Sequence, residues 1–91
     1  AGNIFISDYD NHRLRMVDGR TGVISTIAGG TPPQPGDKIE GFNGDGAALT
    51  TQLRFPRAMA VAPWGNVAFV DTGNDRMREL AEPIEVKLTS V

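Results

Sequence analysis

The sequence predicts an all-β protein made of short antiparallel strands joined by tight turns. Three observations support this fold class: the turn-forming composition, the period-2 alternation of apolar residues, and an internal repeat. The 91 residues include 11 glycines and 6 prolines, which is more than a helical domain would tolerate. A hydrophobic content of 40% is typical of a folded protein and argues against disorder.

The internal repeat is the clearest of the three observations. Residues 2–17 read GNIFISDYDNHRLRMV and residues 65–80 read GNVAFVDTGNDRMREL, and the two stretches align without a gap at an offset of 63. The identical pairs are Gly2/Gly65, Asn3/Asn66, Asp8/Asp71, Asn11/Asn74, Arg13/Arg76 and Arg15/Arg78. Each copy is therefore predicted to be one supersecondary unit.

Seven strands are predicted from short β-branched or alternating runs bounded by turn residues. They cover residues 4–7, 12–17, 23–28, 58–62, 67–70, 75–80 and 84–89. Between the first two strands, Tyr9-Asp10-Asn11 is a turn in which Asn11 is expected to be left-handed. The long connection 29–56 is rich in proline, and residues 47–53 are compatible with one or two helical turns.

These residues resemble NHL repeats over positions 2–80. The resemblance is carried in order by GNIFISDxxNHRLR, TGVISTIAG, GDGAALTTQLRFPRAMAV and GNVAFVDTGNDRMR. The signature that names the family reads Asn11-His12-Arg13-Leu14 in the first copy and Asn74-Asp75-Arg76-Met77 in the second. The chain departs from the pattern in its longer, proline-rich linker at 31–40 and in Asp75, which stands where the first copy has His12.

The resemblance implies a β-propeller, commonly six-bladed, with four antiparallel strands in each blade. On the family's strand order, residues 1–30 are strands two to four of a first blade, 31–56 are an inter-blade connection, and 57–91 are a complete second blade. The expected architecture is therefore a partial propeller of one complete and one incomplete blade. Its expected partners are the remaining blades, from the same longer chain or from associated chains. Three such chains closing a six-bladed ring would leave three strands missing, so a fragment of a longer propeller is favoured.

The most regular polar motif is interpreted as structural. It occurs in both copies, which a single catalytic site would not require, and an Asp and an Arg five residues apart can pair across a tight turn. Its members are Asp8, Asn11 and Arg13 in the first copy and Asp71, Asn74 and Arg76 in the second.

No catalytic residue, metal site or cofactor is predicted. His12 is the only histidine and cysteine is absent, so the chain alone lacks the ligands of a catalytic zinc and the base of a serine nucleophile. The spacing around Asp8 does not match a calcium loop, and Gly41–Gly46 lacks the Lys-Ser/Thr of a phosphate-binding loop. One alternative remains open: a propeller enzyme, either a metal-dependent lyase or a lactonase or dehydrogenase, whose site is completed by missing blades.

The predicted function is a non-enzymatic binding scaffold that recognises a protein or another macromolecule through the loops at the propeller rim. The net charge of −2 and pI near 5.2 argue against nucleic acid, although an RNA-binding propeller that uses local arginines is retained as a further alternative. No apolar run is long enough to span a membrane, and the compartment is left open. The candidate binding residues are Tyr9, His12, Phe42, Arg54 and Arg57.

Overall fold

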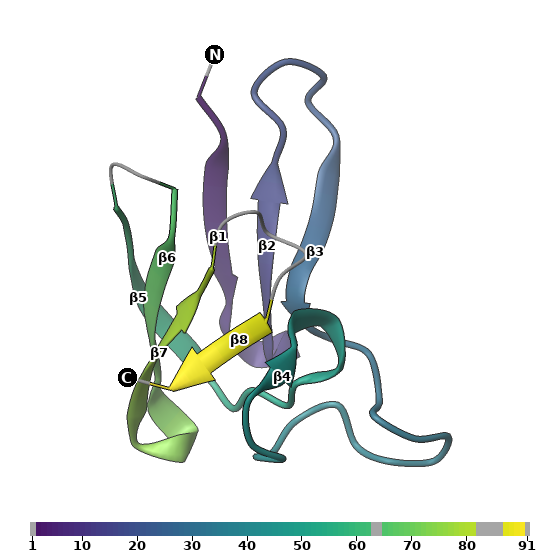
Figure 1. The fold of residues 1–91 in the computed structure, drawn as a ribbon. Coiled ribbons are helices and arrows are strands. Elements are labelled where there is room, and N and C mark those ends of the chain that lie inside the picture. The colour runs from purple at the N-terminus through teal and green to yellow at the C-terminus, as the bar shows by residue number, and fades with distance from the viewer. Residues whose placement is uncertain (1, 63–64, 82–86, 91) are drawn as a thin grey trace.

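A computed structural model of the chain describes residues 2–62, 65–81 and 87–90. The fold is all-β with antiparallel sheets, which confirms the predicted class (Figure 1). Helical structure in these residues is limited to three 3-10 turns, η1 (Tyr9–Asn11), η2 (Ala48–Thr50) and η3 (Thr72–Asn74). No described helix has the length and apolarity needed to cross a membrane.

The first sheet is a three-stranded meander in the order β1-β2-β3. Its strands are β1 (Ile4–Asp8), β2 (Arg13–Val17) and β3 (Ile24–Gly29). β1 pairs with β2 in one continuous register from Ile4 opposite Val17 to Asp8 opposite Arg13. A bulge between Leu14 and Arg15 interrupts the pairing of β2 with β3. These bounds lie within one residue of the predicted strands.

The second sheet has the order β4-β8-β7-β6-β5. Its strands are β4 (Gly46–Ala47), β5 (Pro56–Val61), β6 (Val67–Asp71), β7 (Arg76–Leu80) and β8 (Lys87–Ser90). The strands β5 to β8 form the expected four-stranded meander, but β4 adds a fifth strand by pairing with β8. β5 begins at a proline that the sheet tolerates because β5 is an edge strand. Residues 84–86 of the predicted last strand lie outside the described residues.

One hydrophobic core joins the two sheets and the connection between them. The first sheet turns Leu14 inward, and Phe5 and Met16 of the same face pack against the core at its margin. In the second sheet the alternate positions of the repeat are buried, so Val67 and Phe69 lie in the core. The buried apolar residues are Leu14, Ile27, Ala28, Ala48, Leu53, Val67, Phe69 and Leu80.

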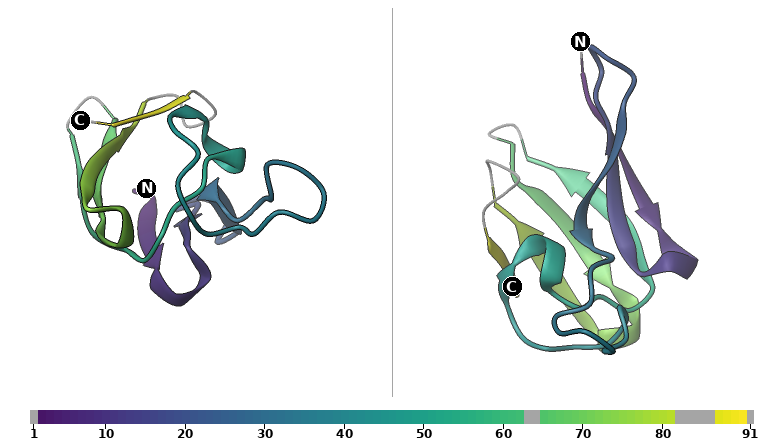
Figure 2. Two further views of the ribbon diagram at one scale, coloured as in Figure 1. Left: turned by 90° about the horizontal axis from the view of Figure 1, so that it is seen from below. Right: turned by 90° about the vertical axis from the view of Figure 1, so that its right-hand side faces the viewer.

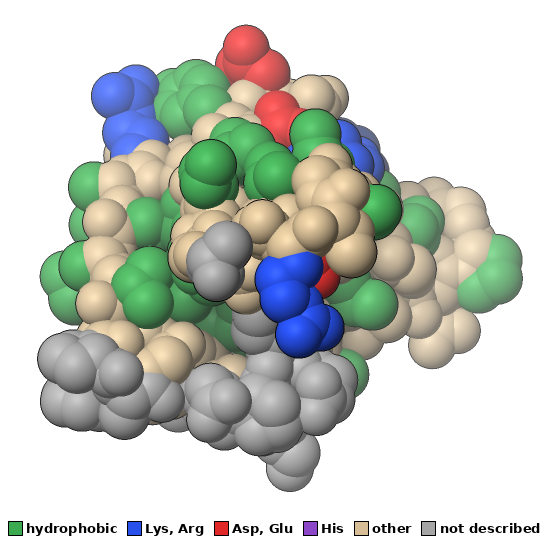
Figure 3. Space-filling view, turned by 90° about the horizontal axis from the view of Figure 1, so that it is seen from above, with side chains coloured by type: hydrophobic (Ala, Val, Ile, Leu, Met, Phe, Trp, Pro, Cys, Tyr) green, Lys and Arg blue, Asp and Glu red, His purple; other side chains and the backbone are tan. Residues whose placement is uncertain are grey.

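The turns η1 and η3 lie at the same end of the molecule, at the bottom of Figure 1, and the chain segment leading into β5 passes between the two sheets there (Figures 1 and 2). The opposite end carries the first residues of β1 and the β2–β3 hairpin, and hydrophobic side chains are visible when it is viewed from above (Figure 3). The hydroxyl of Ser7 on β1 donates to the carbonyl of Arg57 on β5, which ties the sheets together.

Candidate interaction surface

The repeated turn has the same backbone geometry in both copies. The residue after each 3-10 turn is left-handed, with a φ of 53° at both His12 and Asp75. The prediction that Asn11 is the left-handed residue was wrong. Asn11 is the last residue of η1, so the reversal of the chain falls on the capping residue that follows it.

The turn motif is held together by its asparagine and its arginine. Asn11 donates to the Asp8 carboxylate at 2.9 Å, and Arg13 Nε donates to the Asn11 carbonyl at 3.1 Å. The same bonds recur in the second copy, from Asn74 to Asp71 at 2.8 Å and from Arg76 Nε to the Asn74 carbonyl at 3.3 Å. Within the described residues, neither motif arginine forms an ion pair with the aspartate five residues before it. The expected pairing is therefore replaced by a bond from the arginine to a turn carbonyl.

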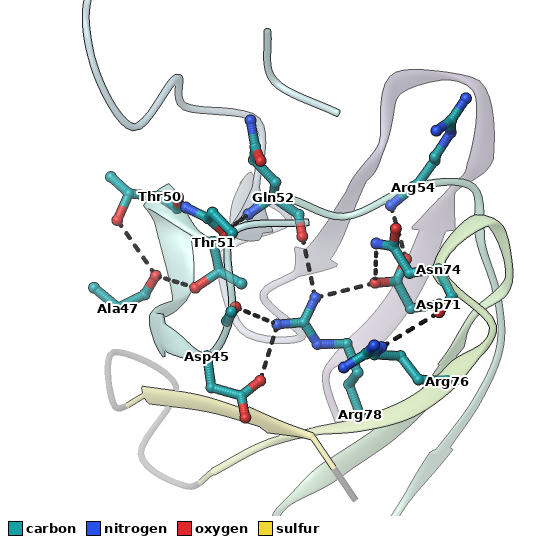
Figure 4. Close-up of polar contacts among 12 residues, drawn as sticks. Asp45, Ala47, Thr50, Thr51, Gln52, Arg54, Asp71, Asn74, Arg76 and Arg78 are labelled. Atoms are coloured by element: carbon teal, nitrogen blue, oxygen red, sulfur yellow. Dashed lines mark hydrogen bonds and ion pairs between the residues drawn. The ribbon is translucent and has the colours of Figure 1, made fainter. Parts of the chain in front are cut away.

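The ion partner of Asp71 is Arg78, which is seven residues further along and lies in β7. Both side chains are fully buried, with 3.0 Å between Arg78 Nη1 and Asp71 Oδ2. Arg78 also donates to three groups of the connection: the Gln52 carbonyl at 3.1 Å, the Gly44 carbonyl at 2.8 Å and the Asp45 carboxylate at 3.1 Å (Figure 4). We call this arrangement the arginine clamp. The identity of Arg15 and Arg78 between the copies was the sequence signal for it.

Asp71 and Asn74 also form hydrogen bonds with the connection. Asp71 Oδ1 accepts a hydrogen bond from the Arg54 backbone amide at 2.7 Å. Asn74 donates to the Gly41 carbonyl at 2.8 Å, and the Gly73 amide donates to the Arg54 carbonyl at 2.7 Å. The connection from 41 to 54 is thus fastened to the β6–β7 turn at both of its ends.

Phe42 packs against the arginine clamp. Its ring lies 3.9 Å from the Arg76 guanidinium carbon and 5.2 Å from that of Arg78, in cation–π geometry. Phe42 is 43% exposed, so it covers the two arginines on one side while its outer surface remains in solvent.

Three of the five candidate binding residues come together around Phe55. The Phe55 ring centroid lies 4.8 Å from that of Tyr9 and 4.5 Å from that of His12. The Arg57 guanidinium lies 4.5 Å from the centroid of the Tyr9 ring and donates to the Tyr9 hydroxyl at 3.0 Å. We call these four residues, Tyr9, His12, Phe55 and Arg57, the rim cluster.

His12 and Phe55 share a constrained backbone in the rim cluster. Both have positive φ, 53° at His12 and 52° at Phe55, which is costly for side chains of this size. The Phe55 amide donates to His12 Nδ1 at 3.1 Å, so each strained residue supports the other. Sequence reasoning missed Phe55, because its importance depends on a contact with a residue 43 positions away.

Arg54 lies beside the rim cluster, and its side chain points away from the arginine clamp (Figure 4). Arg54 and Arg57 are both exposed. The end of the molecule with the two turns therefore presents two cations beside a fixed aromatic group. Such a combination of Arg and Tyr is common at the centres of protein interfaces.

The described residues contain no group of three or more His, Cys, Asp or Glu side chains that could hold a metal ion. An open, mainly apolar groove of about 350 Å³ lies between β2, β3 and η2. The groove does not adjoin the rim cluster.

Comparison with known proteins places one similarity beside this geometry, to a curated mouse protein. No protein-family model matches the chain. Teneurin-1 from Mus musculus is 33% identical to it over 89 residues, which is 90% of this chain and 3% of that protein. The chain thus spans only a small part of the curated relative that it matches.

Replacement of Arg78 by alanine is expected to destabilise the protein by about 3–5 kcal/mol, because Asp71 would remain as an unpaired buried charge. Arg15, at the same repeat position, provides a matched control, and its replacement by alanine is expected to cost less than about 1 kcal/mol. The measurement is chemical denaturation of both variants. Equal losses for the two variants would contradict the account of the clamp.

Replacement of His12 separates its backbone role from its ring. His12→Asn retains an acceptor near the position of Nδ1 and a residue type that tolerates positive φ. His12→Ala removes the acceptor from the Phe55 amide and places alanine in a left-handed conformation. The alanine variant is therefore expected to unfold at lower denaturant, with at least about 1 kcal/mol less stability than the asparagine variant. Indistinguishable variants would show that the ring contact alone matters.

Proposed function

We propose that the chain is a segment of an NHL-type β-propeller and serves as a non-enzymatic scaffold that binds a protein. In this proposal β1–β3 are strands two to four of a first blade and β5–β8 are a complete second blade. The inter-blade connection of residues 31–56 contains β4 and η2 and ends as β5 begins. The matching turn geometry of the two copies and the antiparallel meander in each sheet support this assignment.

The similarity to Teneurin-1 extends over 90% of this chain and therefore includes residues of both copies of the repeat. The remaining blades would come from a longer chain or from associated chains.

The observation that carries the binding role is the rim cluster. Its aromatic rings and Arg57 are fixed by contacts between residues of η1, β5 and the segment before β5, so their ordering costs little on association. Pre-ordered Tyr and Arg side chains are the groups that contribute most at protein interfaces. The adjacent Arg54 extends the cationic surface and favours a partner with acidic groups.

A photo-cross-linking amino acid is placed at Asp10, in the exposed η1 turn, within a longer protein that contains this chain. It is expected to form a covalent adduct with a partner protein. The same residue at Thr21, in the β2–β3 hairpin at the opposite end, is the control and is expected to form little adduct. Arg57→Ala and Arg54→Ala should each reduce the Asp10 adduct about tenfold, as loss of a central interface arginine implies. Arg20→Ala, at an exposed arginine of the β2–β3 hairpin, is the matched control and should leave it unchanged.

Adducts of equal yield from the two positions, or an Asp10 adduct insensitive to both arginine changes, would argue against the rim as a binding surface. An adduct that nuclease removes would instead support the RNA-binding alternative.

A further inference from the structure

The first sheet exposes the face that the second sheet buries. On the offset of 63, Ile4 and Ile6 of β1 correspond to Val67 and Phe69 of β6. Ile4 is 61% exposed and Ile6 is 38% exposed, whereas Val67 and Phe69 are 0% and 1% exposed. The polar residues of the same face correspond as Asp8/Asp71 and Arg15/Arg78, and its last apolar pair is Val17/Leu80. A surface that forms core in one copy is thus open in the other.

The polar contacts of the two copies differ in one consistent way. Bonds within the turn are present in both copies, as between Asn11 and Asp8 and between Asn74 and Asp71. In the first copy only His12 bonds to the connection among the described residues, by accepting from the Phe55 amide, and Asp8, Asn11 and Arg15 form no such bond. In the second copy the equivalent residues Asp71, Asn74 and Arg78 all bond to it. The connection groups bound there are the carbonyls of Gly41, Gly44, Gln52 and Arg54, the Asp45 carboxylate and the Arg54 amide.

Arg15 is the clearest sign of the missing contacts. Among the residues described its guanidinium forms no hydrogen bond or ion pair. Its Nε is buried without an acceptor, as is Arg78 Nε, so the two copies differ at the terminal nitrogens of the guanidinium. A buried donor without an acceptor is costly, because it has lost water and gained no partner. At the equivalent position, Arg78 binds four acceptors.

We propose that Asn11 and Arg15 form a binding site for a Gly-x-x-Gly-Asp-Gly segment from a neighbouring repeat. The segment is of the type that residues 41–52 of this chain provide to Arg78. Its carbonyls and its aspartate bind Arg15, and its first glycine carbonyl accepts from Asn11. This proposal rests on the proposed function, because it takes the two copies as successive blades of one stack.

The chemistry of the occupant follows from the second copy. Gly41 and Gly44 have φ of 136° and 91°, which other residues rarely adopt, so the segment needs glycine at both positions. A side chain on Gly41 would also meet the Gln52 amide oxygen at 3.0 Å. The aspartate supplies the charge that a half-buried arginine requires.

The proposed site in the first copy does not accept an equivalent of Arg54. A side chain at Gly73 would lie 2.5 Å from the Arg54 side chain and 2.8 Å from its carbonyl. The first copy has Asp10 in place of Gly73, so it cannot accept that part of the connection in the same position. We therefore limit the recognised segment to the equivalents of residues 41–52.

The test is a titration of the isotope-labelled chain with a synthetic peptide of residues 41–52, followed by nuclear magnetic resonance. Saturable shifts are expected in β1 and β2 and at the terminal guanidinium N–H signals of Arg15 at millimolar peptide. Arg15→Gln, and a peptide with alanine for its aspartate, should each weaken binding at least tenfold. Arg15→Lys keeps the charge but loses the forked donor geometry, so an intermediate loss is expected.

No saturable shift, shifts confined to β6 and β7, or affinity unchanged in both Arg15 variants would overturn the proposal. The folding of each variant is checked by its amide spectrum, and Arg15→Lys decides the outcome if Arg15→Gln unfolds. Arg57→Ala should leave peptide binding unchanged. A negative result here, together with an Arg57-dependent rim adduct, would remove the segment site and leave the proposed function standing.

Discussion

The buried ion pair between Arg78 and Asp71 organises the part of the chain that is least regular. The connection between the sheets has little secondary structure, so its carbonyls need partners that no strand supplies. Arg78 provides four hydrogen bonds in one place, and Asp71 accepts the Arg54 amide from the other side. The pair thereby fixes the connection to the second sheet and closes the core over Ala48 and Leu53.

The rim cluster depends on this fixation. The chain leaves the clamp at Arg54, and the left-handed conformation of Phe55 turns its ring toward Tyr9 and His12 of the first sheet. A shift of Arg54 would move Phe55 and break its contact with Tyr9 and His12. The residues that resemble a binding surface are therefore the same residues that join one repeat to the next.

The sequence was sufficient to predict the strands and the fold class, because alternation and the internal repeat are local patterns. It could not reveal which face of each sheet is buried, since Arg15 and Arg78 have the same alternation and differ only in what covers them. The strand Gly46–Ala47 was missed because a strand of two residues is too short to show an alternation of apolar and polar side chains. Tyr9, His12 and Arg57 were selected as neighbours of turns, whereas Phe55 and the role of Phe42 depend on distant contacts.

The most direct test of the clamp is native-state hydrogen exchange. The Arg54 amide lies in an irregular segment, but its bond to Asp71 makes it part of the second sheet's cooperative unit. It is expected to exchange with the same opening free energy as the amides of β6 and β7. Exchange of Arg54 at the rate of an unprotected loop, while β6 and β7 remain protected, would contradict the account.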